Sequence, residues 1–420
     1  MDKIVIAGGR PLKGKIRISG SKNAALPIMA ATLLTEGRSE LSNLPKLADI
    51  RTMAALLENL GLKVARWNGK AKVHSNGYRG HEAPYDLVKT MRASVLVLGP
   101  LVARKGKARV SLPGGCAIGA RPIDMHLKGL EAMGAKIKVE HGYVEAAAKK
   151  GLKGARIHFD TVTVTGTENL MMAATLAKGT TVLENAAQEP EIVDLANMLM
   201  GAGAKIHGAG TATLTIEGVE GLSGVKHRIM ADRIEGGTFL IAGCLPGSRL
   251  LLQGMEAQHL DALIDKLREV GAKIEVKKEG IWITAPKRLK PVDVSTAPYP
   301  GFATDLQAQF MALMTVAEGS AVVRENIFEN RFMHVGELVR MGAEIKLEGN
   351  SAIIRGVKSL SGAPIMATDL RASACLVLAG LAAEGITEIS RVYHIDRGYE
   401  KIEKKFRKLG ARVKRVKVKY

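Results

Sequence analysis

Basic residues stand at the starts of four strongly apolar stretches with the composition of helices. A cation at that place opposes the positive end of the helix dipole, which costs roughly 0.3–1 kcal/mol for each helix. An anion held between the cation and the free N–H groups of the helix would remove this penalty. The sequence therefore predicts that an anionic ligand is bound by Lys22, Arg92, Arg233 and Arg371.

Two acidic residues, Asp305 and Asp369, stand at the same place ahead of apolar stretches. An Asp directly before a helix is an ordinary N-cap, because its carboxylate accepts hydrogen bonds from the first N–H groups. On spacing alone, we expect both residues to be N-caps.

The three cysteines fall into two classes. Cys244 and Cys375 lie in apolar helical stretches, where a free cysteine packs as a small hydrophobic residue. Cys116 instead lies in a turn-rich segment, residues 112–122, with three glycines and two prolines. Arg121 is close enough in sequence to favour its thiolate. Two interpretations stay open for Cys116: a catalytic thiol, or a cysteine exposed only because the loop is.

The sequence has no C-x-x-C pair, no G-x-x-x-x-G-K-[ST] loop and no G-x-G-x-x-G at a strand–helix junction. We therefore expect no metal site and no cofactor, and any nucleotide must be bound by residues outside these motifs.

A sixfold repeat organises the elements that carry these residues. A phrase of Gly, small residue, charged residue and β-branched residue follows the end of six amphipathic segments. Its glycines are 73, 69, 68, 71 and 68 residues apart, close to one sixth of the 420-residue chain. We expect each glycine to end a helix in the left-handed conformation and the next residues to open a strand. The glycines are Gly61, Gly134, Gly203, Gly271, Gly342 and Gly410.

Each repeat also holds a second helical segment that is apolar on nearly all sides. A helix without a polar face must be buried on every side. We therefore predict an α+β protein with two domains of three repeats, in which these segments form the interior. They span residues 24–34, 93–103, 170–177, 238–245, 307–317 and 372–383.

The net charge of +20 raises the alternative of a protein that binds nucleic acid or an acidic membrane surface. Aromatic residues make up only 4% of the chain, and the basic residues are spread over all six repeats, so we expect neither. The apolar stretches are too short to cross a membrane, Met1–Arg10 does not form a signal peptide, and three cysteines make no paired framework. We expect a cytoplasmic protein without membrane insertion.

Six motifs resemble the UDP-N-acetylglucosamine 1-carboxyvinyltransferases, of the EPSP synthase/enolpyruvyl transferase superfamily. Together they run from residue 20 to residue 399, so the resemblance covers essentially the whole chain. The motifs are Gly20–Pro27, Pro113–Pro122, Thr304–Gln309, Glu329–His334, Ala367–Ser373 and Tyr393–Tyr399.

This resemblance implies two domains with helices inside and sheets outside, an inside-out α/β barrel. Residues 1–21 with 230–420 would form one domain and residues 22–229 the other, with the Cys116 loop in the second. The active site would lie in the cleft between them and close when the sugar nucleotide binds. We expect a monomer.

The resemblance also implies the reaction. The enolpyruvyl group of phosphoenolpyruvate would move to the 3-hydroxyl of UDP-N-acetylglucosamine with release of phosphate, the first committed step of peptidoglycan synthesis. Cys116 would be the acid, with Asp369 nearby, and Asp305 the general base. Charge on the phosphate and carboxylate would be stabilised by Lys22, Arg121 and Arg397.

The substrate-binding residues follow from the same motifs. Phosphoenolpyruvate binding is implied for Lys22, Asn23, Arg121, Arg371 and Arg397. UDP-N-acetylglucosamine binding is implied for Asn23, Arg92, Arg121, Pro122, Ile123, Asp124, Met125, Thr163, Val164, Thr165, Asp305 and Ile327.

The chain departs from the family pattern in the nucleotide region. Thr161 stands where many members have Lys, and residues 165–167 read Thr-Gly-Thr in place of Gly-Ala-Thr. A diphosphate contact is therefore either lost or made differently. The rival within the superfamily, the transferase that acts on shikimate 3-phosphate, does not use the cysteine loop. It also has an Asp-Lys-Ser type motif where this chain has Ser21-Lys22-Asn23.

Overall fold

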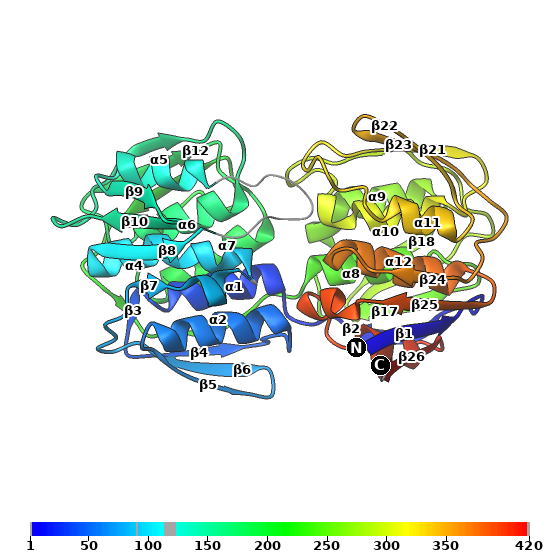
Figure 1. The fold of residues 1–420 in the computed structure, drawn as a ribbon, viewed down its shortest axis with the longest axis horizontal. Coiled ribbons are helices and arrows are strands. Elements are labelled where there is room, and N and C mark those ends of the chain that lie inside the picture. Colours follow the sequence, from blue (N-terminus) through cyan, green and yellow to red (C-terminus); the bar gives the residue numbers. More distant parts are fainter. Residues whose placement is uncertain (1, 90, 113–122, 418–420) are drawn as a thin grey trace. The chain divides into compact units, whose positions relative to one another are not determined.

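The computed structural model describes residues 2–89, 91–112 and 123–417, and the chain forms two compact units (Figure 1). Unit 1 takes in residues 2–19 and 231–417, and unit 2 takes in the described residues of 20–112 and 123–230. Each unit has its own apolar core. Within the described residues the chain passes between the units at residues 19–20 and 230–231, whereas the resemblance implied boundaries at residues 21–22 and 229–230.

Among the described residues, each unit has three inner helices with further helices outside them, which together with the sheets confirms the predicted α+β class. In unit 1 the inner helices are α8 (Arg233–Ala242), α10 (Thr304–Met314) and α12 (Leu370–Ala382). Its outer helices are α9 (Asp261–Glu269), α11 (Val335–Arg340) and α13 (Ile402–Lys408), with 3-10 turns η2 (Ala257–Leu260) and η3 (Val392–Arg397). In unit 2 the inner helices are α1 (Lys22–Ala31), η1 (Arg92–Val97) continued by α4 (Leu98–Lys105), and α6 (Val164–Ala174). Its other helices are α2 (Ala48–Asn59), α3 (Tyr85–Val88), α5 (Asp124–Ala132) and α7 (Pro190–Gly201).

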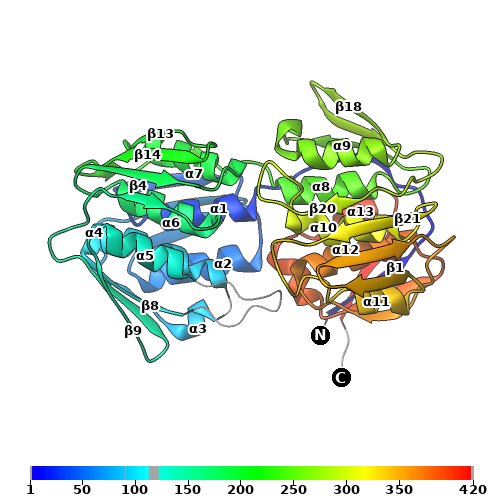
Figure 2. The ribbon, with the colours of Figure 1, turned by 90° about the horizontal axis from the view of Figure 1, so that it is seen from above.

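The four-stranded sheets lie outside these helices and follow one plan (Figure 2). A hairpin pairs with the strand that follows the inner helix, and a short parallel strand lies at the other edge. The orders in unit 1 are β2 (Lys13–Arg17), β17 (Arg249–Gln253), β19 (Gly280–Thr284), β18 (Lys273–Lys277); then β20 (Val294–Ser295), β21 (Ser320–Arg324), β23 (Ser351–Arg355), β22 (Glu344–Glu348); then β24 (Pro364–Met366), β25 (Ile386–Ser390), β1 (Asp2–Ala7), β26 (Arg412–Lys417).

Unit 2 repeats the same order in three sheets. They are β16 (Lys226–Arg228), β4 (Arg38–Ser42), β6 (Lys70–His74), β5 (Lys63–Trp67); then β7 (Glu82–Ala83), β8 (Lys107–Ser111), β10 (Tyr143–Ala147), β9 (Lys136–Glu140); then β11 (Arg156–His158), β12 (Thr180–Glu184), β14 (Thr213–Glu217), β13 (Lys205–His207). A two-stranded pair joins β15 (Leu222–Ser223) to β3 (Thr35–Glu36).

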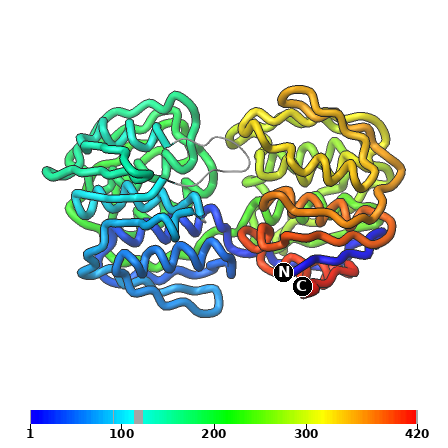
Figure 3. Tube along the Cα trace, viewed as in Figure 1, coloured from blue at the N-terminus to red at the C-terminus, as the bar shows by residue number. Residues whose placement is uncertain are grey.

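The two ends of the chain meet in one sheet of unit 1. Strand β1 lies between β25 and β26 and is antiparallel to both, with Ile4 opposite Ile389 and Arg415. Figure 3 shows the first strand, in blue, beside the last, in red. The sheet of the sixth repeat is therefore completed by the first residues of the chain.

The repeated glycines have the predicted conformation. Their φ angles are 100° at Gly61, 91° at Gly134, 111° at Gly203, 106° at Gly271, 89° at Gly342 and 96° at Gly410. A side chain at these angles would be strained, so glycine is the residue that lets each outer helix turn directly into the next strand.

The inner helices are buried on all sides, as predicted, but most begin earlier than expected. α12 is buried along residues 371–381, whereas α9 buries only Leu263, Ile264 and Leu267. α6 begins six residues before the predicted start at residue 170, because Thr163 caps it by accepting a hydrogen bond from Gly166 N at 3.2 Å. The polar residues that the sequence placed ahead of the helices thus form their first turns. None of the helices among the described residues is long and apolar enough to cross a membrane.

Candidate active site

A carboxylate held between two guanidinium groups is the central feature of unit 1. Asp305 is the second residue of α10, Arg371 is the second residue of α12, and Arg331 lies just before α11. Arg331 Nη2 donates to Asp305 Oδ1 at 2.8 Å, and Arg371 Nη2 donates to Asp305 Oδ2 at 2.6 Å. Both arginine side chains are only 4% exposed, and the Asp305 side chain is 26% exposed. Three separate elements therefore fix this triad.

The charges of Arg331 and Arg371 decide whether Asp305 carries a proton. Burial alone would raise the pKa of Asp305, but the charges of Arg371 and Arg331 outweigh it and hold that pKa well below its usual value. Burial works against the charge of Arg371 too, and Asp305 reverses this and raises the pKa of the guanidinium. The carboxylate is thus anionic and weakly basic while both arginines hold it.

The triad keeps unused capacity to bind an anion. Arg371 Nη1 is buried and makes no hydrogen bond within the described part of the chain. A buried donor without a partner is costly, and a carboxylate or phosphate oxygen would satisfy it. This geometry agrees with the predicted role of Arg371 in binding an anionic substrate.

The N-cap expectation is confirmed for Asp369 and wrong for Asp305. Asp369 Oδ1 accepts hydrogen bonds from Arg371 N at 2.8 Å and Ala372 N at 3.0 Å. Asp305 instead lies inside α10, whose N-cap is Ala303, and no side chain caps that helix. The two arginines turn its carboxylate away from the helix N–H groups. A capping pattern in the sequence does not reveal such partners, because Arg331 and Arg371 lie 26 and 66 residues further along the chain.

Arg397 ends the short turn η3, and the residues on both sides of it are anchored. Asp396 accepts two hydrogen bonds from Arg415 of β26, at 2.9 Å from Nη1 and 2.6 Å from Nη2. On the other side, the Tyr399 hydroxyl lies 2.8 Å from Thr238 Oγ1 of α8. Arg397 therefore lies in a fixed segment.

Gln309 connects this segment to the triad. Its Nε2 donates to the Tyr399 hydroxyl at 3.1 Å and to the backbone carbonyl of Asp305 at 2.9 Å. The Arg371 guanidinium lies 5.6 Å from the Tyr399 ring centroid, within range of a cation–π interaction. Three inner helices and η3 thus meet through buried polar contacts.

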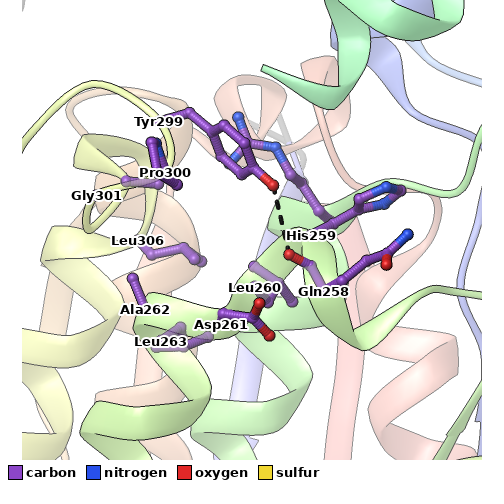
Figure 4. Close-up of a pocket in the computed structure, with 12 residues that line it drawn as sticks. Gln258, His259, Leu260, Asp261, Ala262, Leu263, Tyr299, Pro300, Gly301 and Leu306 are labelled. Carbon is purple, nitrogen blue, oxygen red and sulfur yellow. Dashed lines mark hydrogen bonds between the residues drawn. The ribbon is translucent and has the colours of Figure 1, made fainter. Parts of the chain in front are cut away.

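A small pocket lies beside the start of α8 and is lined by Arg233, one of the four basic residues singled out in the sequence. Its other lining residues include Gln258, His259 and Tyr299 (Figure 4), and the Tyr299 hydroxyl donates to the carbonyl of Gln258 at 3.4 Å. Its volume of about 50 Å³ is far below the ~300 Å³ of ligand pockets.

Ile327, expected to bind UDP-N-acetylglucosamine, lies after β21 and donates its N–H to Glu325 Oε1 at 2.8 Å.

In unit 2, Lys22 and Asn23 form the start of α1 and are both partly buried. The Lys22 ammonium lies 3.7 Å from Asp49 Oδ2 of α2, with side-chain exposures of 13% and 5%. This carboxylate explains in part how a cation is tolerated at the start of a helix. Lys22 remains a charged donor on an inner helix, which is what a phosphate-binding role requires.

The two segments expected to bind the nucleotide lie together in unit 2. Asp124 begins α5, and Thr163 and Thr165 lie at the start of α6. The His126 ring joins the segments, because its Nε2 lies 3.3 Å from Thr165 Oγ1. Arg92, the first residue of η1, is close enough for its charge to lower the pKa of His126, after the larger effect of burial.

The other residues of unit 2 that were expected to bind the nucleotide lie at the starts of α5 and α6 or outside the described part of the chain. Ile123 is buried directly before α5, and Met125 Sδ lies 3.7 Å from Thr161 Oγ1. Val164 is the first residue of α6. Cys116, Arg121 and Pro122 lie outside the described residues. Cys244 and Cys375 are fully buried, as predicted.

Several residues of these clusters had no role predicted from the sequence. Arg331 lay within a quoted motif but had no assigned role, and His126, Asn169, Tyr399 and Arg415 were not singled out. For Arg331, its place in that motif, directly after Asn330, was an available signal. The others act through partners that are distant in sequence, and composition does not indicate those.

Comparison with known proteins supports the fold and the motifs together. Residues 6–406 match the EPSP synthase (3-phosphoshikimate 1-carboxyvinyltransferase) family. A UDP-N-acetylglucosamine 1-carboxyvinyltransferase from Trichlorobacter lovleyi is 62% identical over 416 residues and one from Geotalea uraniireducens is 61% identical, each covering 99% of this chain and at least 99% of the relative. The enolpyruvyl transferase NikO from Streptomyces tendae has a TM-score of 0.88 at 25% identity, covering 99% of this chain and 98% of its own. An EPSP synthase from Acinetobacter baumannii has a TM-score of 0.76 at 19% identity, covering 99% and 100%, and shows the same fold.

These matches confirm the resemblance drawn from the six motifs. The chain belongs to the EPSP synthase family of enolpyruvyl transferases and, within it, to the UDP-N-acetylglucosamine 1-carboxyvinyltransferases.

Proposed function

We propose that this enzyme transfers the enolpyruvyl group of phosphoenolpyruvate to the 3-hydroxyl of UDP-N-acetylglucosamine and releases phosphate, a step of peptidoglycan synthesis. The relatives that are about 60% identical over their full length carry the name of this activity. The observation in the structure that best supports it is the triad of Asp305 with Arg331 and Arg371, which joins a proton acceptor to two anion-binding groups.

The reaction is an addition followed by an elimination. In the addition, the sugar oxygen forms a bond to C2 of the enolpyruvyl group, its proton passes to a base, and an acid protonates the C3 methylene. In the elimination, the bond from C2 to the phosphate oxygen breaks and C3 loses a proton. Both steps move charge onto oxygens, so fixed cations lower the barrier.

Asp305 is our candidate for the base, and Arg331 and Arg371 for groups that hold the carboxylate of phosphoenolpyruvate. In the free enzyme the arginines satisfy Asp305 and keep it weakly basic. When a substrate carboxylate draws the guanidinium groups toward itself, Asp305 loses part of that stabilisation and becomes a better proton acceptor. Substrate binding would thus switch on the base.

Lys22, Asn23, Arg121 and Arg397 are the proposed further ligands of phosphoenolpyruvate. Lys22 and Arg397 are charged donors at fixed places in their units. From the sequence motifs we also propose that Cys116 is the acid, with Asp369 close to the reacting group. UDP-N-acetylglucosamine binding is assigned to the residues inferred from those motifs, which include Arg92, the start of α5 and the start of α6.

Phosphate release tests the proposed reaction and its acceptor. We expect release from phosphoenolpyruvate with UDP-N-acetylglucosamine as acceptor and none with shikimate 3-phosphate. Release only with shikimate 3-phosphate, or with neither acceptor, would contradict the proposal. Both substrates are soluble phosphorylated metabolites, which supports a cytoplasmic reaction.

Alkylation by fosfomycin tests the assignment of Cys116. We expect one adduct per chain, on Cys116, and loss of phosphate release. Cys244 and Cys375 are the internal controls, because burial raises the pKa of both thiols and keeps them protonated and unreactive. A mass spectrum with the adduct on either of these would refute the assignment, and activity that survives full alkylation of Cys116 would remove it from the mechanism.

A further inference from the structure

A chain of buried hydrogen bonds in unit 2 has a single possible direction. It begins at Asn169 of α6, which is fully buried. Gly99 N–H donates to Asn169 Oδ1 at 2.6 Å, and Asn169 Nδ2 donates to the carbonyl of Val95 at 3.2 Å. A backbone N–H can only donate and a carbonyl can only accept, so these two contacts fix which end of the amide is oxygen and which is nitrogen.

The orientation of Asn169 fixes the tautomer of His126. Asn169 Nδ2 lies 2.9 Å from His126 Nδ1, and an amide nitrogen is only a donor, so Nδ1 must accept. His126 is 2% exposed, and burial, followed by the charge of Arg92, lowers its pKa to about 4. The ring is therefore neutral at pH 7 and carries its one proton on Nε2.

The protonated Nε2 fixes the role of Thr165. Nε2 lies 3.3 Å from Thr165 Oγ1, so the ring donates and the hydroxyl oxygen accepts. Thr165 is partly exposed, and its own O–H has no acceptor among the residues that the structure describes. The hydroxyl is left with a proton to donate away from the protein core.

We propose that Thr165 is a specificity-determining residue that donates a hydrogen bond to an acceptor oxygen of the bound uridine nucleotide, and that His126 is the positioning residue that imposes this polarity. The acceptor is either a diphosphate oxygen or a uracil carbonyl. The inference rests on the proposed nucleotide site at the starts of α5 and α6.

The donor role of Thr165 explains how the nucleotide could be bound although residues 161–167 depart from the family pattern. Thr161 and Thr165 are two of the positions at which the sequence departs from the pattern of the family that it resembles. A hydroxyl oxygen that already accepts from a histidine has half of its acceptor capacity in use, whereas its one proton is uncommitted, so the group is available first of all as a donor. The site therefore favours groups rich in acceptors, which a neutral donor can bind without adding charge.

Side-chain NMR of the full chain tests the polarity directly. Long-range ¹H–¹⁵N spectra distinguish the two neutral tautomers of histidine, and the His126→Asn variant identifies the His126 signals by their loss. We expect a neutral ring at pH 7 with the proton on Nε2. A proton on Nδ1 alone would overturn the inference, because the bare Nε2 would then accept the proton of the Thr165 hydroxyl and leave none for the nucleotide.

Calorimetric binding of UDP-N-acetylglucosamine tests the role of the hydroxyl. Thr165→Val should weaken binding roughly tenfold, the effect of losing one hydrogen bond to a polar or charged acceptor, and Thr165→Ser should restore it. Thr215→Val, a matched change on β14 of the same unit, should leave binding unchanged. Equal affinity of Thr165→Val and the wild type would refute the proposal.

A series of shorter ligands locates the acceptor. If it is a phosphate oxygen, Thr165→Val weakens UDP and leaves uridine unchanged; if it is a uracil carbonyl, both weaken. In a His126→Asn background, Thr165→Val should weaken nucleotide binding less than threefold, because the two side chains act as one unit. The same tenfold loss of affinity in both backgrounds would refute the role of His126.

Arg92→Ala separates failure of this inference from failure of the nucleotide site itself. If Arg92→Ala weakens UDP-N-acetylglucosamine and Thr165→Val does not, the site is correct and the Thr165 inference is wrong. If neither variant weakens a ligand that the wild type binds, the nucleotide is bound elsewhere and both proposals fail.

Discussion

Removal of the Asp305 carboxylate should destabilise unit 1 and at the same time create a stronger anion site. The Asp305→Ala variant leaves Arg331 and Arg371 facing each other, both 4% exposed, without the oxygens that they contact at 2.8 and 2.6 Å. Breaking a buried ion pair in this way costs about 3–5 kcal/mol. Because the Asp305 side chain is 26% exposed, we expect the lower end, about 3 kcal/mol, or about a hundredfold in the folding equilibrium.

Inorganic phosphate should return most of this stability to the variant. An anion that binds only the native state stabilises it by RT ln(1 + [L]/Kd), or about 2.7 kcal/mol at a hundred times Kd. In the wild type Asp305 occupies the same guanidinium groups, so phosphate should stabilise that protein much less. The comparison measures directly how strongly Asp305 competes with an anionic ligand.

Tryptophan fluorescence can follow unit 1 alone. The chain has two tryptophans, Trp67 in β5 of unit 2 and Trp282 in β19 of unit 1. In a Trp67→Phe background, urea unfolding monitored by Trp282 reports unit 1. Asp265→Ala is a matched control, since its exposed pair with Arg268 should contribute less than 1 kcal/mol.

Two outcomes would refute this reasoning. One is an unfolding midpoint of Asp305→Ala equal to that of the control. The other is equal stabilisation of the variant and the wild type by phosphate. Asp305→Asn completes the test of the base: it keeps the shape of the side chain but accepts no proton, so kcat should fall about 10²- to 10⁴-fold.

Two further predictions concern acid stability and the Arg397 segment. Burial lowers the pKa of His126 and of His334 to about 4, below the usual 6.5, so the unfolded chain takes up protons that the native state does not. Stability should therefore fall as the pH drops from 6.5 toward 4, by about 2 to 3 kcal/mol per histidine at pH 4.5. Urea unfolding at pH 7.5 and 4.5 should show a smaller loss in His126→Asn and His334→Gln, and an unchanged loss would contradict the cause. In Arg415→Lys, the lysine cannot form the two-point contact that Arg415 makes with Asp396. Because Arg397 would then be displaced, KM for phosphoenolpyruvate should rise several-fold while KM for the sugar nucleotide stays constant. An equal rise in both KM values would indicate general loss of structure.

Much of the fold follows from patterns that are local in the sequence. The six glycines recur at nearly constant spacing because each ends a helix in the left-handed conformation, and the structure bears this out at every one. The inner helices could be recognised because a helix with no polar face must be buried all round. Their starts were placed too late at α6, because the polar first turn was taken for the segment before the helix.

The interactions within the site could not be predicted in the same way. Asp305 and Arg371 are 66 residues apart, and Asp396 meets an arginine of the last strand. Such pairs depend on which repeats pack side by side, and a pattern within one repeat does not carry that information. The N-cap reading of Asp305 failed for this reason, whereas that of Asp369 succeeded because a cap needs only its own helix.

The buried charges of unit 1 are better explained by ligand binding than by stability. A buried ion triad contributes little more than well-packed apolar residues of the same volume, because desolvation offsets most of the attraction. Most other residues of α10 and α12 are apolar, so apolar residues at the positions of Asp305 and Arg371 would suit the fold. Arg371 also keeps one buried nitrogen, Nη1, with no hydrogen bond to the described residues. A side chain selected for stability alone would have that donor satisfied, whereas one that must receive a substrate carboxylate needs it free.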